Sequence, residues 1–324
     1  MFTLSELRQA HDFVLRAVRP TPALSWPLLD GRLGAEVVVK HENHLPTGAF
    51  KVRGGLTYVD ALIKREPATR GIISATRGNH GQSLAFAGRR AGLKVTILAP
   101  QGNSTEKNAA MRALGAELIE FGRDFQAARE QAMRLASSRG LHMVPSFHRD
   151  LALGVGTYAL ELLSERSDLD VLYVPIGQGS GICGCISARD ALGLKTEIIG
   201  VQSTEAPAYA LSFAAGHVVP TDGADTLADG MATRVPDEEA LAAIMKGAAR
   251  IALVSDDEIA AAVRAYWADT HNLSEGAGAA ALAAAMKERS RLKGRKVGLV
   301  LSGGNIDFDL FRRWIVAAPS AVAA

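Results

Sequence analysis

Cysteine is scarce in this sequence: the 324 residues include only 2, Cys183 and Cys185, and a single residue separates them. Cysteines this close rarely pair, and a metal site needs more ligands, so we interpret both as small packing residues in a reducing compartment. Long apolar runs are also missing, since no stretch of about 18 uncharged apolar residues occurs, and this excludes a membrane-spanning helix. The amino terminus has no basic segment followed by an apolar one, so we expect no signal peptide.

An excess of charge of one sign is missing as well. The formal net charge is +2 and no long block of like charges occurs, which argues against a nucleic-acid-binding surface. Hydrophobic residues make up 48% of the chain and charged residues 22%, which is the balance of a soluble globular protein. We therefore expect a cytoplasmic enzyme that acts on a small molecule.

The order of predicted elements indicates an α/β fold. The chain is long for one core, so we expect two lobes or one large α/β domain. Short buried strands alternate with helices, which predicts a parallel sheet with helices on both faces. The predicted strands span residues 35–40, 71–75, 94–100, 116–120, 171–175, 196–202 and 297–301. The predicted helices span residues 5–18, a segment after residue 55, and 83–91, 104–114, 125–138, 156–166, 256–270 and 275–288.

The most informative stretch is 46–55, Pro-Thr-Gly-Ala-Phe-Lys-Val-Arg-Gly-Gly, which we interpret as a loop before a helix. Lys51 has apolar neighbours, and burial among them would lower its pKa, while Arg53 would add a like charge that acts in the same direction. A lysine with a lowered pKa is nucleophilic near neutral pH and can form a Schiff base with an aldehyde. The alternative is a half-buried structural lysine at the start of a helix.

A second motif, residues 174–184, lies between a buried strand and a helix and reads Val-Pro-Ile-Gly-Gln-Gly-Ser-Gly-Ile-Cys-Gly. Its glycines allow backbone N–H groups to approach a phosphate, and the start of the helix favours an anion. Gly179, Gly181 and Gly184 also fit the spacing of a dinucleotide-binding turn. The following strand ends in Gln202 rather than in the acidic residue that would hold a ribose, so we favour a phosphate monoester over NAD.

Two further turns follow buried strands. Residues 76–82, Thr-Arg-Gly-Asn-His-Gly-Gln, could hold a carboxylate through free N–H groups, and the Asn79 amide could donate to a phenolic oxygen. His80 could act as a general base or could simply order the loop. Residues 302–304, Ser-Gly-Gly, end the last strand, where open α/β sheets bind ligands, although many tight turns have this sequence.

Together these motifs resemble the fold-type-II pyridoxal-phosphate (PLP) enzymes, in particular the branch of threonine/serine dehydratases and serine racemases. The resemblance runs from Arg-Pro-Thr-Pro at 19–22 to Ser-Gly-Gly-Asn at 302–305, with Ala-Asp-Gly at 228–230 and Glu-Gly-Ala-Gly-Ala at 275–279 between them. It implies a two-lobed, tryptophan synthase β-like α/β fold with parallel or mixed sheets flanked by helices. Residues 1–55 and 148–324 would form the large PLP-binding domain and residues 56–147 the small domain, and a homodimer is expected.

The resemblance also implies a role for each motif. Lys51 would bond to the cofactor and be the catalytic residue, Phe50 would pack beside the ring, Asn79 would contact a ring oxygen and Ser302 would face the pyridine nitrogen. The phosphate would bind to the turn formed by Gly177, Gln178, Gly179, Ser180 and Gly181. The substrate would contact the loop formed by Thr76, Arg77, Gly78, Asn79 and His80, and Gly230 and Glu275 are further candidate site residues.

The implied activity is that of a PLP-dependent carbon–oxygen lyase of the threonine/serine dehydratase type, an ammonia-lyase. A serine opposite the pyridine nitrogen does not enforce its protonation as a carboxylate would, which favours loss of a β-hydroxyl over transamination. The substrate would be a 3-hydroxy amino acid, either threonine or serine or a variant such as 3-hydroxyaspartate or 3-phenylserine. A racemase and a β-replacement synthase are alternatives on this fold, and an NAD-binding oxidoreductase leaves Lys51 and Ser302 unexplained.

Three sites depart from the family pattern. Arg77 stands where this branch has a small residue, a serine in the racemase, and since arginine stays charged and is a poor acid or base, racemisation is disfavoured. Arg77 could instead pair with a second substrate carboxylate, or point to solvent or a partner subunit. Gln178 and Ser180 interrupt the usual run of four glycines but keep their N–H donors. Ala208 replaces an acidic ligand of the branch's cation site, so we expect no metal there.

Overall fold

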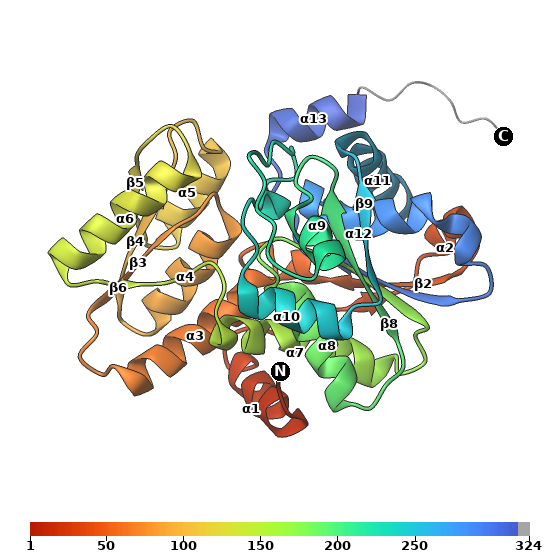
Figure 1. Ribbon diagram of the computed structural model, residues 1–324, viewed down its shortest axis with the longest axis horizontal. Coiled ribbons are helices and arrows are strands. Elements are labelled where there is room, and N and C mark those ends of the chain that lie inside the picture. Colours follow the sequence, from red (N-terminus) through yellow and green to blue (C-terminus); the bar gives the residue numbers. More distant parts are fainter. Residues whose placement is uncertain (317–324) are drawn as a thin grey trace.

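The computed structural model describes residues 1–316 and contains two β-sheets with helices on both faces of each (Figure 1). The strands are β1 (Ala23–Leu24), β2 (Glu36–His41), β3 (Gly71–Ala75), β4 (Lys94–Ala99), β5 (Glu117–Glu120), β6 (His142–Met143), β7 (Val171–Pro175), β8 (Glu197–Ser203), β9 (Arg250–Val254) and β10 (Lys296–Leu301). The α-helices are α1 (Leu4–Val14), α2 (Pro27–Leu33), α3 (Lys51–Arg65), α4 (Asn79–Arg90), α5 (Thr105–Ala113), α6 (Phe125–Arg139), α7 (Arg149–Glu165), α8 (Ser180–Ala191), α9 (Ala208–Ala215), α10 (Glu238–Gly247), α11 (Asp256–Thr270), α12 (Gly276–Lys287) and α13 (Phe308–Val316).

The larger sheet has six strands in the order β1-β2-β10-β7-β8-β9, and β1 alone runs antiparallel to its neighbour. Alternate residues of its strands enter different cores. Val37 and Val39 pack with α2, α11 and α12 on one face, whereas Val38 packs with α1, α7 and α8 on the other. Strands covered on both faces read as nearly continuous apolar runs, which is why the sequence revealed most of them.

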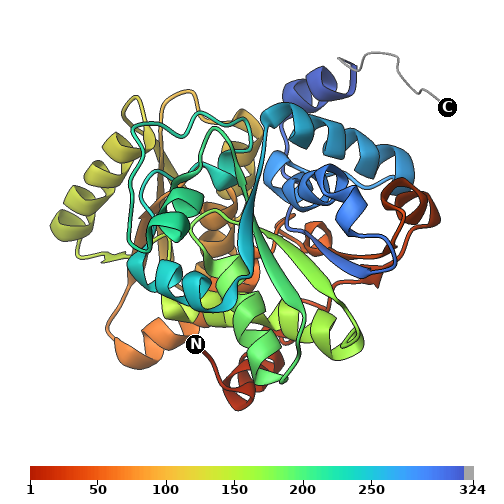
Figure 2. The same cartoon turned by 45° about the vertical axis from the view of Figure 1, so that its right-hand side comes forward.

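The smaller sheet has four parallel strands in the order β5-β4-β3-β6, all between residues 71 and 143. Ile72 packs with α3 and α4 on one face, and Ile73 packs against α6 on the other. The predicted α/β fold with parallel or mixed sheets is therefore confirmed, and both views show the two sheets side by side (Figure 2). The domain boundaries at residues 55 and 148 stay a prediction. The helix α3 runs through the first boundary and packs against α7, which begins just after the second.

The stretch around Lys51 differs from the prediction, because the helix α3 begins at Lys51 itself instead of after Gly55. The two glycines serve close helix packing rather than a loop. A Cβ at Gly54 would lie 2.6 Å from the Leu151 carbonyl oxygen of α7, and one at Gly55 would lie 2.2 Å from the Ser83 Oγ of α4. Glycine in a helix interior usually indicates a break, so this stretch was misread.

The sequence analysis also missed α2, α9, α10 and β9, together with the two-residue strands β1 and β6. Both α9 and α10 lie in the part of the chain between β8 and α11, where turn residues obscure the helical pattern. Within residues 1–316, no helix has the length and apolar character needed to cross a membrane. Cys183 and Cys185 are free and buried in α8, as expected of packing residues.

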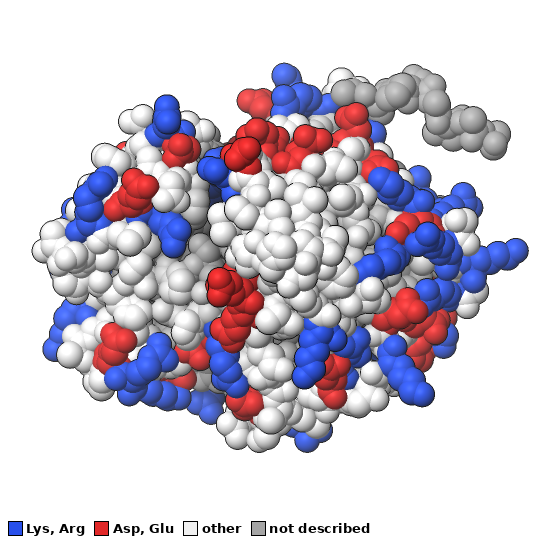
Figure 3. Space-filling model, viewed as in Figure 1, with Lys and Arg blue, Asp and Glu red and all other residues white. Residues whose placement is uncertain are grey.

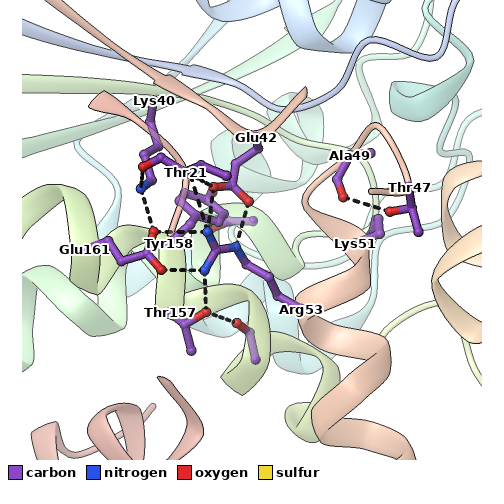
Figure 4. Close-up of polar contacts among 12 residues, drawn as sticks. Thr21, Lys40, Glu42, Thr47, Ala49, Lys51, Arg53, Thr157, Tyr158 and Glu161 are labelled. Carbon is purple, nitrogen blue, oxygen red and sulfur yellow. Dashed lines mark hydrogen bonds and ion pairs between the residues drawn. The ribbon is translucent and has the colours of Figure 1, made fainter. Parts of the chain in front are cut away.

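A buried ion-pair network joins the two helices beside the Lys51 turn (Figure 4). Arg53 is fully buried, and its Nε lies 2.8 Å from Glu42 Oε2 while its Nη1 lies 2.7 Å from Glu161 Oε1 on α7. Lys40 adds a second cation, 2.6 Å from Glu161 Oε2. Burial disfavours the charge of Arg53, but the two carboxylates outweigh it and raise its pKa. The network therefore fixes the first turn of α3 against both β2 and α7.

Removing one member of this network should be costly, since it leaves the opposite charges buried without a partner. We expect Arg53→Met to lower the free energy of unfolding by about 3–5 kcal/mol, measured by chemical denaturation at pH 7. Lys64→Met is the matched control, because it removes an exposed pair with Asp60 on the same helix. That control should cost about 0.5 kcal/mol or less. Equal stability of the two variants would contradict the role assigned to Arg53.

Candidate active site

A cavity of about 600 Å³ lies between loops that follow the strands of both sheets. Figure 3 shows the face of Figure 1, where basic and acidic side chains are mixed around a largely uncharged middle and several acidic side chains lie along its upper edge. The cavity is lined by all of the candidate site residues: Phe50, Lys51, Thr76, Arg77, Gly78, Asn79, His80, Gly177, Gln178, Gly179, Ser180, Gly181, Gly230, Glu275 and Ser302. The structure thus brings the four sequence motifs together, while their individual roles stay predictions.

The amine of Lys51 lies at the centre of these motifs. Its Nζ donates to Ser180 Oγ at 3.1 Å and lies 5.0 Å from the centre of the Phe50 ring. Burial lowers the pKa of Lys51 to about 8. The expected contribution of Arg53 to this shift is wrong, because the Arg53 side chain points away from Lys51 toward Glu42 and Glu161 (Figure 4). Desolvation alone makes Lys51 a nucleophile near neutral pH.

The glycine turn between β7 and α8 forms a cradle of backbone. Gly179 has φ +98°, a left-handed conformation that favours glycine, and a Cβ at Gly177 would lie 2.3 Å from the Gly230 carbonyl oxygen. The first N–H groups of a helix have no partner within it, and in α8 these belong to Ser180 and the residues after it. This geometry fits a phosphate group. The Gly230 carbonyl oxygen packs against the turn at Gly177.

Asn79 begins α4 and is held by two other side chains. Its Nδ2 donates to Glu275 Oε1 at 2.7 Å, and its Oδ1 accepts from Asn305 Nδ2 at 2.8 Å. Asn305 also donates to the Thr47 carbonyl oxygen at 2.8 Å. These contacts leave one amide hydrogen of Asn79 for a ligand, as the contact with a ring oxygen would require.

His80 is buried beside the cavity. Burial, together with the nearby charge of Lys51, lowers the pKa of His80 to about 3, so its ring is neutral at physiological pH. Its Nε2 has no hydrogen-bond partner among residues 1–316. A base this weak does not suit proton abstraction near neutral pH, so the environment favours the second interpretation, in which His80 orders the loop and offers a polar atom to a ligand.

Ser302 follows β10 and is buried, and its carbonyl oxygen accepts from the Phe50 N–H group at 3.0 Å. Within residues 1–316 its hydroxyl makes no hydrogen bond to another protein group, and Ser302 lines the cavity. The donor set of the cavity is therefore an amine, a phosphate cradle, an amide and a hydroxyl. These groups fit the aldehyde, phosphate, ring oxygen and ring nitrogen of pyridoxal phosphate.

Several residues of the cavity were not predicted. Lys107 of α5 lies 2.6 Å from Asp229 and 3.8 Å from Glu275, measured from its Nζ to a carboxylate oxygen of each. Its signal in the sequence was its place four residues before Met111 on the buried face of α5, an unusual position for a lysine. Arg129 of α6 and residues 222–225 and 231–235 also line the cavity, and only the tertiary structure could reveal them.

Gln202 lies near the carboxyl end of β8 and is buried. Its Oε1 accepts from the Ala210 N–H group at 2.8 Å, so the position that would hold a ribose is used inside the protein. Across residues 1–316 no group of three or more histidine, cysteine, aspartate and glutamate side chains is arranged to bind a metal.

The pKa of Lys51 predicts how the apoprotein will take up its aldehyde. Only the neutral amine attacks, so the rate of covalent pyridoxal phosphate binding should rise with pH and level off above a midpoint near pH 8, because burial lowers the Lys51 pKa to about 8. The appearance of the yellow colour in stopped flow measures this rate. Lys51→Ala should stay colourless, and a midpoint near the ordinary lysine pKa would refute the desolvated environment.

The contact between Gly177 and Gly230 predicts a difference between two neighbouring glycines. Gly177→Ala should lower the free energy of unfolding by about 1–3 kcal/mol, since its methyl group would overlap backbone. Gly181→Ala is the matched control, because its Cβ would meet no atom closer than 3.5 Å. Chemical denaturation of the two variants compares them. An equal loss in both would show that the turn, rather than the Gly230 contact, is the sensitive element.

Comparison with known proteins agrees with this geometry. The family described as "Pyridoxal-phosphate dependent enzyme" matches residues 14–303. An L-threonine ammonia-lyase of Thermotoga maritima is 33% identical over 97% of this chain and 78% of its own length. An L-threo-3-hydroxyaspartate ammonia-lyase of Saccharomyces cerevisiae is 32% identical over 95% of each chain.

Among solved structures, a pyridoxal 5'-phosphate-dependent aspartate racemase has a similar fold, with a TM-score of 0.89 and 29% identity over 95% of this chain and 97% of its own. Lyases and a racemase thus stand at similar distances from this chain. Family, fold and cofactor class agree with the resemblance seen in the sequence. The chain belongs to the pyridoxal-phosphate-dependent enzymes, in the branch related to threonine dehydratases, hydroxyaspartate ammonia-lyase and serine racemases.

Proposed function

We propose that this protein is an ammonia-lyase that converts a 3-hydroxy amino acid to a 2-oxo acid and ammonia. The observation that carries the proposal is the position of the Lys51 amine, 3.1 Å from Ser180 at the glycine turn, with its pKa lowered to about 8. An amine of this pKa is available near neutral pH both to bond an aldehyde and to accept a proton.

Different residues of the cavity have different roles in the proposed reaction. When bound, pyridoxal phosphate draws electrons from the Cα of an attached amino acid and makes the Cα proton acidic. Lys51 Nζ would take this proton. The N–H groups from Gly177 to Gly181 would hold the phosphate, and Asn79 would donate to the ring oxygen. Lys51 is thereby the one group assigned to move a proton at Cα.

Ser302 supports elimination over transamination. A hydroxyl donates to a pyridine nitrogen without enforcing its protonation, as a carboxylate would, so charge stays nearer to Cα when its proton leaves. A β-hydroxyl on the neighbouring carbon is then expelled readily. Burial of Ser302 and the contact of its backbone with Phe50 keep the hydroxyl at the cavity wall.

Arg77 supports a substrate with a second carboxylate. Its side chain is exposed, lines the cavity and makes no ion pair with any residue in 1–316. A guanidinium can bind a carboxylate through two parallel hydrogen bonds. Because it stays charged, Arg77 cannot exchange protons on the far side of Cα, which disfavours racemisation. We therefore rank 3-hydroxyaspartate above threonine, serine and 3-phenylserine as the substrate.

Release of 2-oxo acid from these four amino acids, in threo and erythro forms where they exist, tests the proposal. We expect 3-hydroxyaspartate to react fastest and Arg77→Ala to lower its kcat/KM about 10- to 100-fold, as loss of a hydrogen bond to a charged group would. Lys51→Ala should abolish turnover of every substrate.

Arg70→Ala is the matched control, since Arg70 is also exposed and lies at the opposite end of β3, outside the cavity lining. Turnover of neutral substrates alone, indifferent to Arg77, would return the enzyme to the threonine/serine type. No 2-oxo acid from any substrate, with formation of a D-amino acid instead, would replace the lyase by a racemase.

A further inference from the structure

Lys107 connects the two sheets at the edge of the cavity. It lies in the first turn of α5, which packs with the four-stranded sheet, and its side chain is only 9% exposed. Its two anionic partners, Asp229 and Glu275, lie on segments that pack with the six-stranded sheet. Nearby, Glu106 Oε1 accepts from the Phe308 N–H group at 2.9 Å, a second contact between the same two parts.

Glu275 is the link between Lys107 and the proposed cofactor site. It is buried just before α12, and its Oε1 accepts from Asn79 at 2.7 Å. Its Oε2 makes no hydrogen bond within residues 1–316, and the nearest cation is Lys107 at 3.8 Å. A Cβ at Gly303 would lie 2.4 Å from Glu275 Oε1, so the carboxylate is also tightly enclosed.

The charges around Glu275 act in opposite directions. Burial raises the pKa of Glu275, the Asp229 carboxylate raises it further, and the Lys107 ammonium and the Asn79 hydrogen bond lower it. Asp307 acts on the cluster from a greater distance through Lys107. Without Lys107, the buried Glu275 carboxylate would lie near the partly exposed Asp229 carboxylate with no cation between them, which favours protonation of Glu275.

We propose that Lys107 is a positioning residue: it supplies the counter-charge for Glu275 and thereby fixes the Asn79 amide, so that one amide N–H stays directed to the cofactor ring oxygen. The proposal rests on the proposed function for the role of Asn79. The proposal assigns Lys107 no contact with the cofactor or the substrate. It acts through Glu275, and it makes the orientation of Asn79 depend on contact between the two sheets.

The Glu275 carboxyl can be observed directly. Infrared difference spectra of the PLP-loaded protein, recorded over a pH series without substrate, show a C=O stretch when the buried carboxyl is protonated, and loss of the band in Glu275→Gln assigns it. We expect Lys107→Met to raise the midpoint of this band by about 1–3 pH units, since an ion pair is lost. Lys107→Arg should keep it nearer to the wild-type value.

Asp229→Asn provides a test of opposite sign. It removes the charge that raises the Glu275 pKa and leaves Lys107 with Glu275 alone, so the midpoint should fall. This fall includes the loss of the direct repulsion between Asp229 and Glu275, so it is compared with the rise expected in Lys107→Met. If Lys107→Met does not fold, Lys107→Gln replaces it, and a Glu275 midpoint that does not rise in that variant overturns the proposal.

Cofactor binding shows whether the effect passes through Glu275. Lys107→Met should weaken pyridoxal phosphate binding about five- to tenfold, the size expected for one disturbed hydrogen bond. In a Glu275→Gln background the same substitution should have no further effect. Equal losses in both backgrounds would overturn the proposal. These measurements need no turnover, so failure of the ammonia-lyase assignment in the substrate panel would leave them valid.

Discussion

The site depends on one buried guanidinium. Arg53 neutralises Glu42 and Glu161 in a place that water does not reach, and it thereby joins the end of β2, the first turn of α3 and the side of α7. Lys51 lies two residues earlier on the same turn. The network therefore holds the backbone of Lys51, but it offers no carboxylate to the Lys51 amine. Because Arg53 is paired with carboxylates and Lys51 is not, burial lowers the pKa of Lys51 without an opposing charge.

Burial has different consequences for the three ionisable groups around the cavity. It lowers the pKa of Lys51 to about 8, it keeps His80 uncharged, and it raises the pKa of Glu275 to about 7 against the opposing charge of Lys107. The protonation state of each group thus depends on its surroundings as well as on its ordinary pKa. The segments that pack on the two sheets meet at this cavity and bury its ionisable groups. The protonation state of the site therefore depends on the contact between these segments.

The sequence predicted those features that neighbouring residues determine. Buried strands followed by glycine turns marked the phosphate cradle and the turn at Ser302, because a parallel sheet brings such turns to one edge. The lowered pKa of Lys51 was predicted from its apolar neighbours, although the contribution expected from Arg53 was wrong. Gly54 and Gly55 were taken for a loop because the residues they pack against lie on α7 and α4. The direction of the Arg53 side chain and the contacts of Lys107 involve residues more than a hundred positions away, and no local pattern contains them.

The glycine contacts of α3 also limit how this enzyme can change. With Gly54 and Gly55 against the backbone of α7 and the side of α4, the helix that carries Lys51 has no space for larger residues. Arg77 and residues 231–235 border the same cavity, and none of them is a glycine packed against a neighbouring helix. Substitutions that change the substrate, whether in natural homologues or in a library made by directed evolution, are therefore expected at the residues that line the cavity. The helix that carries Lys51 should stay unchanged.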